Sequence, residues 1–201
     1  LMKMLKLVTS VASTNTYILY NDSDCVIVDP GDNAPLLFST LEENGLKCKF
    51  VLLTHAHFDH CNVCSLLQSY GAKVFMHAGD KSLLRTDKNL AVKFGIAFKS
   101  FKPDYYVTDG QKLDLCGIEF TVVHTPGHTN GSVCYLAENF MFSGDTLFHL
   151  SVGRTDFPTG SDAKMRKSIK KLFALNKDYI VLPGHGLQTR LSYERVSNPY
   201  A

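Results

Sequence analysis

The 201-residue sequence lacks a strong charge bias and a long apolar run. Its formal net charge of +2 is too small to indicate nucleic-acid binding. No apolar run approaches the roughly 20 residues that span a bilayer. We therefore expect neither a nucleic-acid nor a membrane partner. The 45% of apolar residues and 20% of charged residues are typical of a globular protein rather than a disordered chain.

We expect no export signal in this sequence. Residues 2–8 have a basic start followed by apolar residues, which end at Thr9 and Ser10, whereas a signal peptide needs about 7–15 consecutive apolar residues. This segment is predicted to form a first strand and a turn. The six cysteines are expected to be free thiols in a reducing cytosol, because a chain of this length needs no disulfides. The predicted location is cytoplasmic.

No repeat, low-complexity segment or linker divides the chain, so we expect a single domain over residues 1–201. Helices are predicted at 35–44, 62–70 and 163–174. Strands are predicted at 16–20, 25–28, 50–53, 73–76, 112–115, 118–124, 132–137, 140–143 and 179–182. Segment 81–102 is ambiguous and is assigned a helix followed by a connector. This mixture favours an α/β architecture in which helices cover sheets.

A dense group of candidate metal ligands follows the predicted strand that ends at Leu53. The motif H-x-H-x-D-H contains His55, His57, Asp59 and His60. Imidazole and carboxylate together suit zinc, iron or manganese. Histidines two residues apart cannot share one face of a regular α-helix. We therefore place the motif in a loop between a strand and a helix.

Three further candidates, His128, Asp145 and His185, also follow predicted strands. A glycine directly precedes each of them, and glycine lets the backbone turn sharply. Ligands at four strand ends can converge on one edge of a sheet. Seven ligands exceed the three or four that a tetrahedral zinc takes. They suit two metals about 3.5–4 Å apart.

Taken together, these motifs resemble those of the metallo-β-lactamase superfamily, and most closely its short glyoxalase II (hydroxyacylglutathione hydrolase) branch. The H-x-H-x-D-H motif marks the superfamily, while TPGHTNGS at 125–132 and SGDTLF at 143–148 narrow the resemblance. The resemblance implies a four-layer αββα sandwich of two mixed β-sheets flanked by helices. It also implies that the C-terminal helical region with which long glyoxalase II enzymes bind glutathione is missing here.

The resemblance assigns a role to each ligand. It implies a first metal held by His55, His57 and His128, and a second held by Asp59, His60 and His185, with Asp145 as the bridge. Asp29 would orient the ligands from behind. The two divalent ions are expected to be zinc, with iron or manganese as alternatives.

The implied activity is hydrolysis of a small-molecule thioester, S-2-hydroxyacylglutathione or a relative, by a hydroxide that bridges the metals. Asp59 would orient this hydroxide. A mononuclear iron persulfide dioxygenase remains an alternative, because such enzymes share the segment 153–157 (GRTDF). A lactonase is another. A β-lactamase is disfavoured, since Asp145 stands where those enzymes commonly carry a cysteine ligand. The sequence does not predict an oligomeric state.

Several other residues have two interpretations. Arg154 either contacts an anionic substrate or pairs with Asp156, and His149 is a candidate substrate contact. The pair Cys61 and Cys64 forms a C-x-x-C, which can indicate redox chemistry or zinc binding. The simpler interpretation is that both thiols pack near the site. His77 and His124 are expected to be structural.

Overall fold

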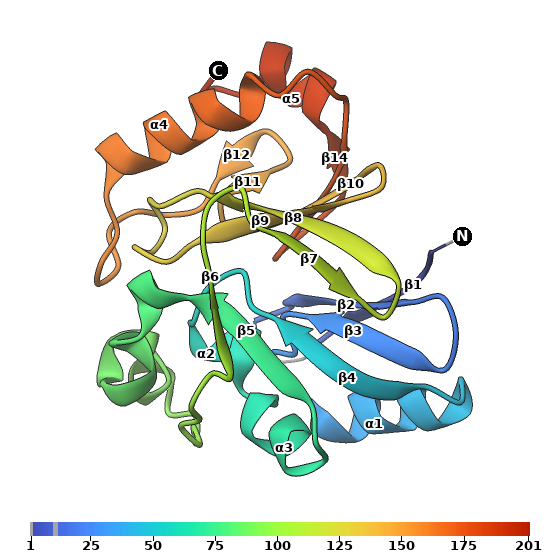
Figure 1. The fold of residues 1–201 in the computed structure, drawn as a ribbon. Helices are drawn as coiled ribbons and strands as arrows, with labels where there is room; N and C mark the ends of the chain where they lie inside the picture. The colour runs from blue at the N-terminus through green and yellow to red at the C-terminus, as the bar shows by residue number, and fades with distance from the viewer. Residues whose placement is uncertain (1, 10–11) are drawn as a thin grey trace.

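The computed structural model describes residues 2–9 and 12–201. Two six-stranded mixed sheets lie face to face, and helices cover the outer face of each sheet (Figure 1). The predicted four-layer αββα sandwich is therefore confirmed. Ser10, where the sequence predicts a turn, lies outside the described residues.

The first sheet carries the N-terminal half of the chain in the order β1-β2-β3-β4-β5-β6. Strands β1 to β3 are antiparallel neighbours, and β3 to β6 run parallel. Its strands are β1 (Lys3–Val8), β2 (Asn15–Tyr20), β3 (Asp24–Val28), β4 (Lys47–Leu52), β5 (Lys73–His77) and β6 (Tyr105–Val107).

The second sheet has the order β14-β13-β10-β9-β8-β7, and β10 and β13 are its parallel pair. Its strands are β7 (Lys112–Leu115), β8 (Ile118–His124), β9 (Val133–Ala137), β10 (Phe140–Gly144), β13 (Ile180–Pro183) and β14 (Thr189–Arg190). A small separate hairpin pairs β11 (Leu147–Phe148) with β12 (Ser151–Val152).

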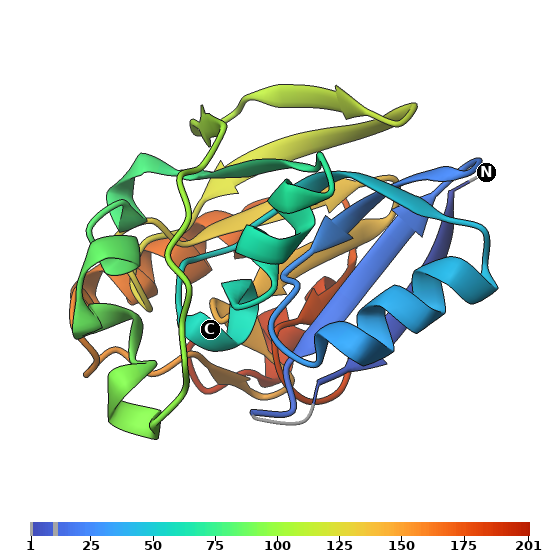
Figure 2. The same cartoon turned by 90° about the horizontal axis from the view of Figure 1, so that it is seen from below.

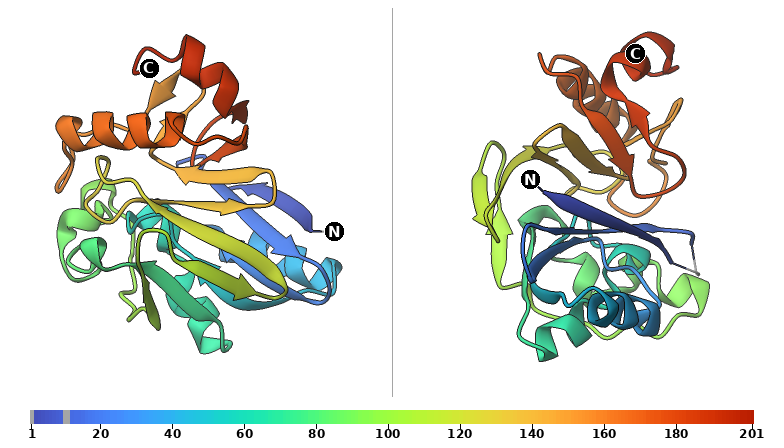
Figure 3. Two further views of the ribbon diagram at one scale, coloured as in Figure 1. Left: turned by 45° about the horizontal axis from the view of Figure 1, so that its top comes forward. Right: turned by 90° about the vertical axis from the view of Figure 1, so that its right-hand side faces the viewer.

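The helices divide between the two outer faces, as Figures 2 and 3 show. Helices α1 (Ala34–Glu43), α2 (Phe58–Cys61) and α3 (Cys64–Ser69) lie on the side of the first sheet. Helices α4 (Asp162–Phe173) and α5 (Leu191–Ser197) lie on the side of the second. Among the described residues, no helix has the length and apolar character needed to cross a membrane.

Three apolar clusters hold these layers together. The central cluster lies between the sheets and contains side chains of both, including Val28, Phe120 and Phe142. A second cluster packs α1 and α3 against the first sheet. The third packs α4 against the second sheet, and it uses Met165, Ile169 and Leu172. This apolar burial is the main stabilising contribution to the sandwich.

Two helix predictions need correction. The helix predicted at 62–70 is split into α2 and α3, and it begins earlier, at Phe58. The helix predicted within 81–102 is wrong, because the chain forms three short 3-10 turns there: η2 (Leu83–Arg85), η3 (Asp87–Asn89) and η4 (Val92–Phe94). Another such turn, η1 (Ala78–Asp80), precedes the segment. The Thr86 side chain accepts a bond from the Lys88 amide and starts a new turn, which competes with a continuous helix.

Candidate metal centre

The seven predicted ligands meet at one end of the sandwich, where strands from both sheets end. Their ligand atoms form three overlapping groups, and the atoms of each group lie within 4.8 Å of one another. The groups are His55, His57 and His128; His55, His60 and Asp145; and Asp59, His60 and His185. Chain segments from both sheets therefore supply one compact centre.

The first group consists of three buried imidazoles. Nδ1 of His57 lies 3.1 Å from Nε2 of His55 and 2.9 Å from Nε2 of His128. The three rings stand nearly perpendicular to one another, at 87–88°. Three ring nitrogens thus surround one point, and His57 uses the opposite nitrogen from its two neighbours.

Asp59, His60 and His185 form what we call the second group, which includes a carboxylate. Nε2 of His60 lies 3.3 Å from Nε2 of His185 and 3.4 Å from Oδ2 of Asp59. The same Asp59 oxygen lies 3.3 Å from Nε2 of His185. It also accepts a hydrogen bond from the Thr14 hydroxyl at 3.0 Å. The Asp59 side chain is therefore held in place from the N-terminal part of the chain.

Asp145 lies between the two groups. Its Oδ1 is 3.4 Å from Nε2 of His60. Its Oδ2 is 3.5 Å from Nε2 of both His128 and His185. One carboxylate therefore faces histidines of both groups.

Outer hydrogen bonds set the orientation of the rings. Nδ1 of His60 donates to Oδ2 of Asp29 at 2.9 Å. His128 and His185 donate their Nδ1 protons to backbone oxygens, those of Arg154 at 2.7 Å and Ala12 at 3.0 Å. A ring that donates from one nitrogen presents a lone pair on the other. All three rings therefore present Nε2 lone pairs to the centre.

Asp29 also anchors the ligand loop itself. It accepts bonds from the amide of Thr54 at 2.8 Å and from its hydroxyl at 2.6 Å. Because that hydroxyl donates to Asp29, it accepts from Nδ1 of His55, 3.1 Å away. This relay leaves Nε2 of His55 free to face the centre. Asp29 thus occupies the position behind the ligands that the sequence predicts.

These residues fit divalent metal ions. Within the described residues, Oδ1 of Asp145 is buried without a hydrogen-bond partner, and burial of an unpaired polar atom is costly. The inward ring nitrogens face one another as acceptors, so only a cation or protons can satisfy them. Nitrogen and oxygen donors of this kind suit zinc, iron and manganese.

Electrostatics differ between the two groups in the metal-free protein. Burial and the neighbouring His128 ring lower the pKa of His57 to about 3, so this ring is neutral. Burial also opposes protonation of His60, but nearby carboxylates, Asp59 foremost, raise its pKa to about 9. A proton on the second group therefore occupies the place that a cation would take.

One glycine beside the ligands is required for space. A Cβ on Gly184 would lie 2.4 Å from Oδ1 of Asp145 and 2.6 Å from Cε1 of His60. The sequence predicts a sharp turn at each glycine that precedes a ligand. Gly144 does adopt a positive φ, of 49°, whereas Gly184 instead allows the β13 end to approach the ligands closely.

A cavity of about 470 Å³ opens above the centre. Its floor includes His57, Asp59, His128, Asp145 and His185. The walls are mainly apolar: Phe58, Leu90, Phe94, Phe148, Val152 and Phe157. Such a cavity, with polar ligands at its base, is the usual form of a small-molecule site.

Arg154 lines this cavity and makes the ion pair that the sequence offers as one of two interpretations. Its guanidinium donates to both carboxylate oxygens of Asp156 at 2.6–2.7 Å. It also lies over the ring of Phe157, 3.9 Å from the centroid. Both contacts hold the cation at the cavity wall.

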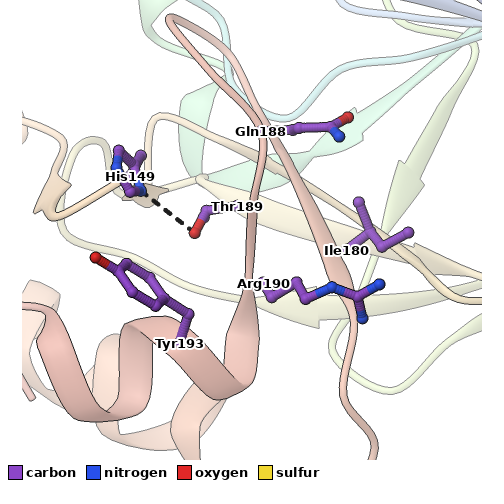
Figure 4. A pocket seen from close by; sticks show the side chains of 6 residues that line it. All are labelled: His149, Ile180, Gln188, Thr189, Arg190 and Tyr193. Carbon is purple, nitrogen blue, oxygen red and sulfur yellow. Dashed lines mark hydrogen bonds between the residues drawn. The ribbon is translucent and has the colours of Figure 1, made fainter.

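His149 lies elsewhere. It lines a separate, open pocket with Ile180, Gln188, Thr189, Arg190 and Tyr193 (Figure 4). Its Nδ1 lies 3.4 Å from the Thr189 hydroxyl, and its ring stacks on Tyr193. The structure therefore does not bring His149 into the cavity above the ligands.

The remaining candidates have structural surroundings. Cys61 and Cys64 are fully buried, and burial raises the pKa of both thiols. All six cysteines are unpaired. His77 and His124 stack on each other, with ring centroids 4.0 Å apart. None of these four residues lines the cavity.

The sequence-based list omits one buried carboxylate near the centre, that of Asp80. It accepts bonds from the Ala56 amide at 3.0 Å, the Thr129 hydroxyl at 2.8 Å and the Gly131 amide at 2.6 Å. These partners lie 24 to 51 residues away in the chain. The only local signal was its position shortly after a predicted strand.

Comparison with known proteins places this geometry in a family. The family model described as "Metallo-beta-lactamase superfamily" matches residues 9–185. Hydroxyacylglutathione hydrolase GloC from Haemophilus influenzae is 36% identical over 200 residues, which cover 96% of this chain and 94% of that protein.

Two solved structures are also similar. BLEG-1 B3 metallo-beta-lactamase has a TM-score of 0.91 at 35% identity and covers 98% of this chain and 99% of its own. TTHA1623 in a di-iron-bound form has a TM-score of 0.89 at 32% identity, with 98% and 100% covered. The sandwich, the ligand motifs and these matches agree, and the chain belongs to the metallo-beta-lactamase superfamily.

Proposed function

We propose that this chain is a binuclear metallohydrolase that cleaves thioesters, with S-2-hydroxyacylglutathione or a related compound as substrate. The observation that carries the proposal is the position of Asp145 between two complete ligand groups beneath the apolar cavity. The similarity to a hydroxyacylglutathione hydrolase supports the thioester. Zinc is the proposed metal, with iron or manganese as alternatives. The unpaired cysteines support a cytoplasmic location.

Bound divalent metals would supply a hydroxide nucleophile at neutral pH and would polarise the substrate carbonyl. The residues of this chain would position the attacking water and exclude bulk water from the reacting carbonyl. Asp59 lines the cavity, and its pKa is lowered to about 2 by His60 and His185, which overcome the effect of burial. It therefore stays ionised and acts as a hydrogen-bond acceptor that orients the attacking water.

The cavity walls suggest how the substrate lies. The apolar side chains of Phe58, Phe94 and Phe157 would hold the acyl group and exclude bulk water from the carbonyl. Arg154 is the cation on the wall and would contact an anionic group of the thiol carrier. An Arg154→Gln variant should then raise KM for a glutathione thioester and leave KM unchanged for a neutral thioester.

Two measurements test the function. Metal content per chain, measured by inductively coupled plasma mass spectrometry on protein expressed without added metal, should be close to two. Hydrolysis of S-lactoylglutathione should then follow Michaelis–Menten kinetics. A single iron, with oxygen uptake from glutathione persulfide and no thioester hydrolysis, would replace the proposal with the dioxygenase.

One finding favours a second candidate, β-lactam hydrolysis. The similar structure of BLEG-1 is named as a B3 metallo-beta-lactamase. We therefore include nitrocefin and a simple lactone in the same panel. The thioester proposal requires kcat/KM for S-lactoylglutathione to exceed that for either ring substrate by at least tenfold. The opposite ranking would overturn it.

A further inference from the structure

We propose that Asp80 is a positioning residue for the first metal group, and that it acts by joining the two loops that carry this group's histidines. The proposal rests on the proposed metal centre but not on the thioester. Asp80 is fully buried and lines no part of the cavity. Its carboxylate therefore acts through other residues rather than on substrate.

Both contacts of Oδ2 of Asp80 are made by residues next to ligands of the first group. Oδ2 accepts from the Ala56 amide, which lies between His55 and His57 in the chain. The same oxygen accepts from the hydroxyl of Thr129, the residue after His128. The two loops follow strands of different sheets, so Asp80 sets the distance between them.

Asp29 and Asp80 flank the same ligand loop. In the sheet, β4 lies between β3 and β5. Asp29 follows β3 and bonds His60 of the second group. Asp80 follows β5 and bonds the loop backbone beside the first group. The loop after β4 is thus held by one carboxylate from each neighbouring strand. Asp29 contacts His60 directly and His55 through Thr54, whereas Asp80 bonds the backbone only beside the first group.

The residues around Asp80 are tightly packed. A Cβ on Gly131 would lie 2.6 Å from Cγ of Asp80. A Cβ on Gly79 would lie 2.7 Å from the Asn130 backbone oxygen. Oδ1 of Asp80 accepts from the Gly131 amide at 2.6 Å. Both oxygens therefore receive donors, and an amide in place of the carboxylate would direct N–H groups at N–H groups.

Zinc binding tests the proposal without any assay of activity. Asp80→Asn is made in two backgrounds of the full chain: His185→Ala, which keeps the first group, and His128→Ala, which keeps the second. Zinc affinity is measured by competition with a chelator. We expect Asp80→Asn to lower the affinity for zinc about 10–100-fold in the His185→Ala background. A loss of this size is typical when a residue behind the metal ligands is changed. In the His128→Ala background the change should stay within about twofold.

Asp29→Asn is the control, and it should weaken zinc binding in both backgrounds, because Asp29 bonds His60 directly and reaches His55 through the Thr54 hydroxyl. Equal weakening by Asp80→Asn in both backgrounds would show a general effect on the fold and would overturn the proposal. No weakening in either background would also overturn it. Because only zinc is measured, the result does not depend on which substrate the protein hydrolyses.

If Asp80→Asn fails to fold, two conservative substitutions of Thr129 test the proposal instead. Thr129→Val removes the hydroxyl that donates to Asp80 and keeps the shape, whereas Thr129→Ser keeps the hydroxyl. In the His185→Ala background, we expect Thr129→Val to lower the affinity for zinc. Thr129→Ser should keep the affinity within about threefold of that of the background protein. Equal affinities for the Val and Ser variants would overturn the proposal.

Discussion

Oδ1 of Asp145 lies 3.4 Å from Nε2 of His60, although the two residues follow strands of different sheets. His60 is fully buried, and only 11% of the Asp145 side chain is exposed. The contact therefore joins the two halves of the sandwich at the floor of the cavity.

Asp145→Ala should remove most activity and reduce metal content together. The carboxylate faces ligands of both groups, so its loss should exceed the roughly 10–100-fold effect of a residue behind the ligands. Metal content by mass spectrometry and kcat/KM are measured on the same preparation. Full activity with two metals per chain would refute the bridging role.

Gly184→Ala should weaken metal binding, because its Cβ would contact Asp145 and His60. Overpacking of this kind typically costs about 1–3 kcal/mol. Gly186→Ala is the control: its Cβ meets no atom within 4 Å, but its φ of +76° imposes a backbone cost of about 1–2 kcal/mol. Both variants should lose stability in denaturant titrations, but only Gly184→Ala should also lose metal affinity.

Phe94→Ala should raise KM for thioesters with apolar acyl groups, a prediction that depends on the proposed function. Phe94 lines the cavity and is 55% exposed, so its loss is worth about 1 kcal/mol, or roughly fivefold in KM. kcat should change little. Val92→Ala, at a 74% exposed neighbour, should leave both constants unchanged. Equal effects of the two variants would argue against contact between Phe94 and the acyl group of the substrate.

His77 should make the fold acid-sensitive. Burial and the stacked His124 lower the pKa of His77 below its ordinary value of 6.5, and Asp109 only partly offsets this. The unfolded chain therefore binds the proton more readily, and stability is lost as pH falls through about 6.5. In urea titrations from pH 7.5 to 5, the wild type should lose more stability than His77→Asn. An equal loss of stability in the wild type and in His77→Asn over this pH range would contradict the prediction.

Local signals made the ligands predictable as a group. His128, Asp145 and His185 each follow an apolar strand and a glycine, and these features are visible in short windows of sequence. Parallel and antiparallel strands that end at one edge bring such residues together, as the structure shows. Which metal they bind, and how many ions, stays a prediction.

Other features depend on contacts between distant residues. Asp80 has partners 24, 49 and 51 residues away, so a sequence window around it shows only that it follows a predicted strand and not which residues it contacts. Helix α5 (Leu191–Ser197) was also missed. It is short, and its buried Glu194 accepts bonds from Thr189 and Leu150 outside the helix. Tertiary contacts, rather than local helix propensity, explain such an element.

The division of ligands between the two sheets has a consequence for the order in which the protein matures during synthesis. A ribosome releases the H-x-H-x-D-H loop early, whereas His185 follows β13, near the end of the described chain. Chains begin to fold from the N-terminus as they emerge. If the centre holds two metals as proposed, the nascent chain could not hold the second until the second sheet has docked on the first, and full metallation would mark the completion of folding.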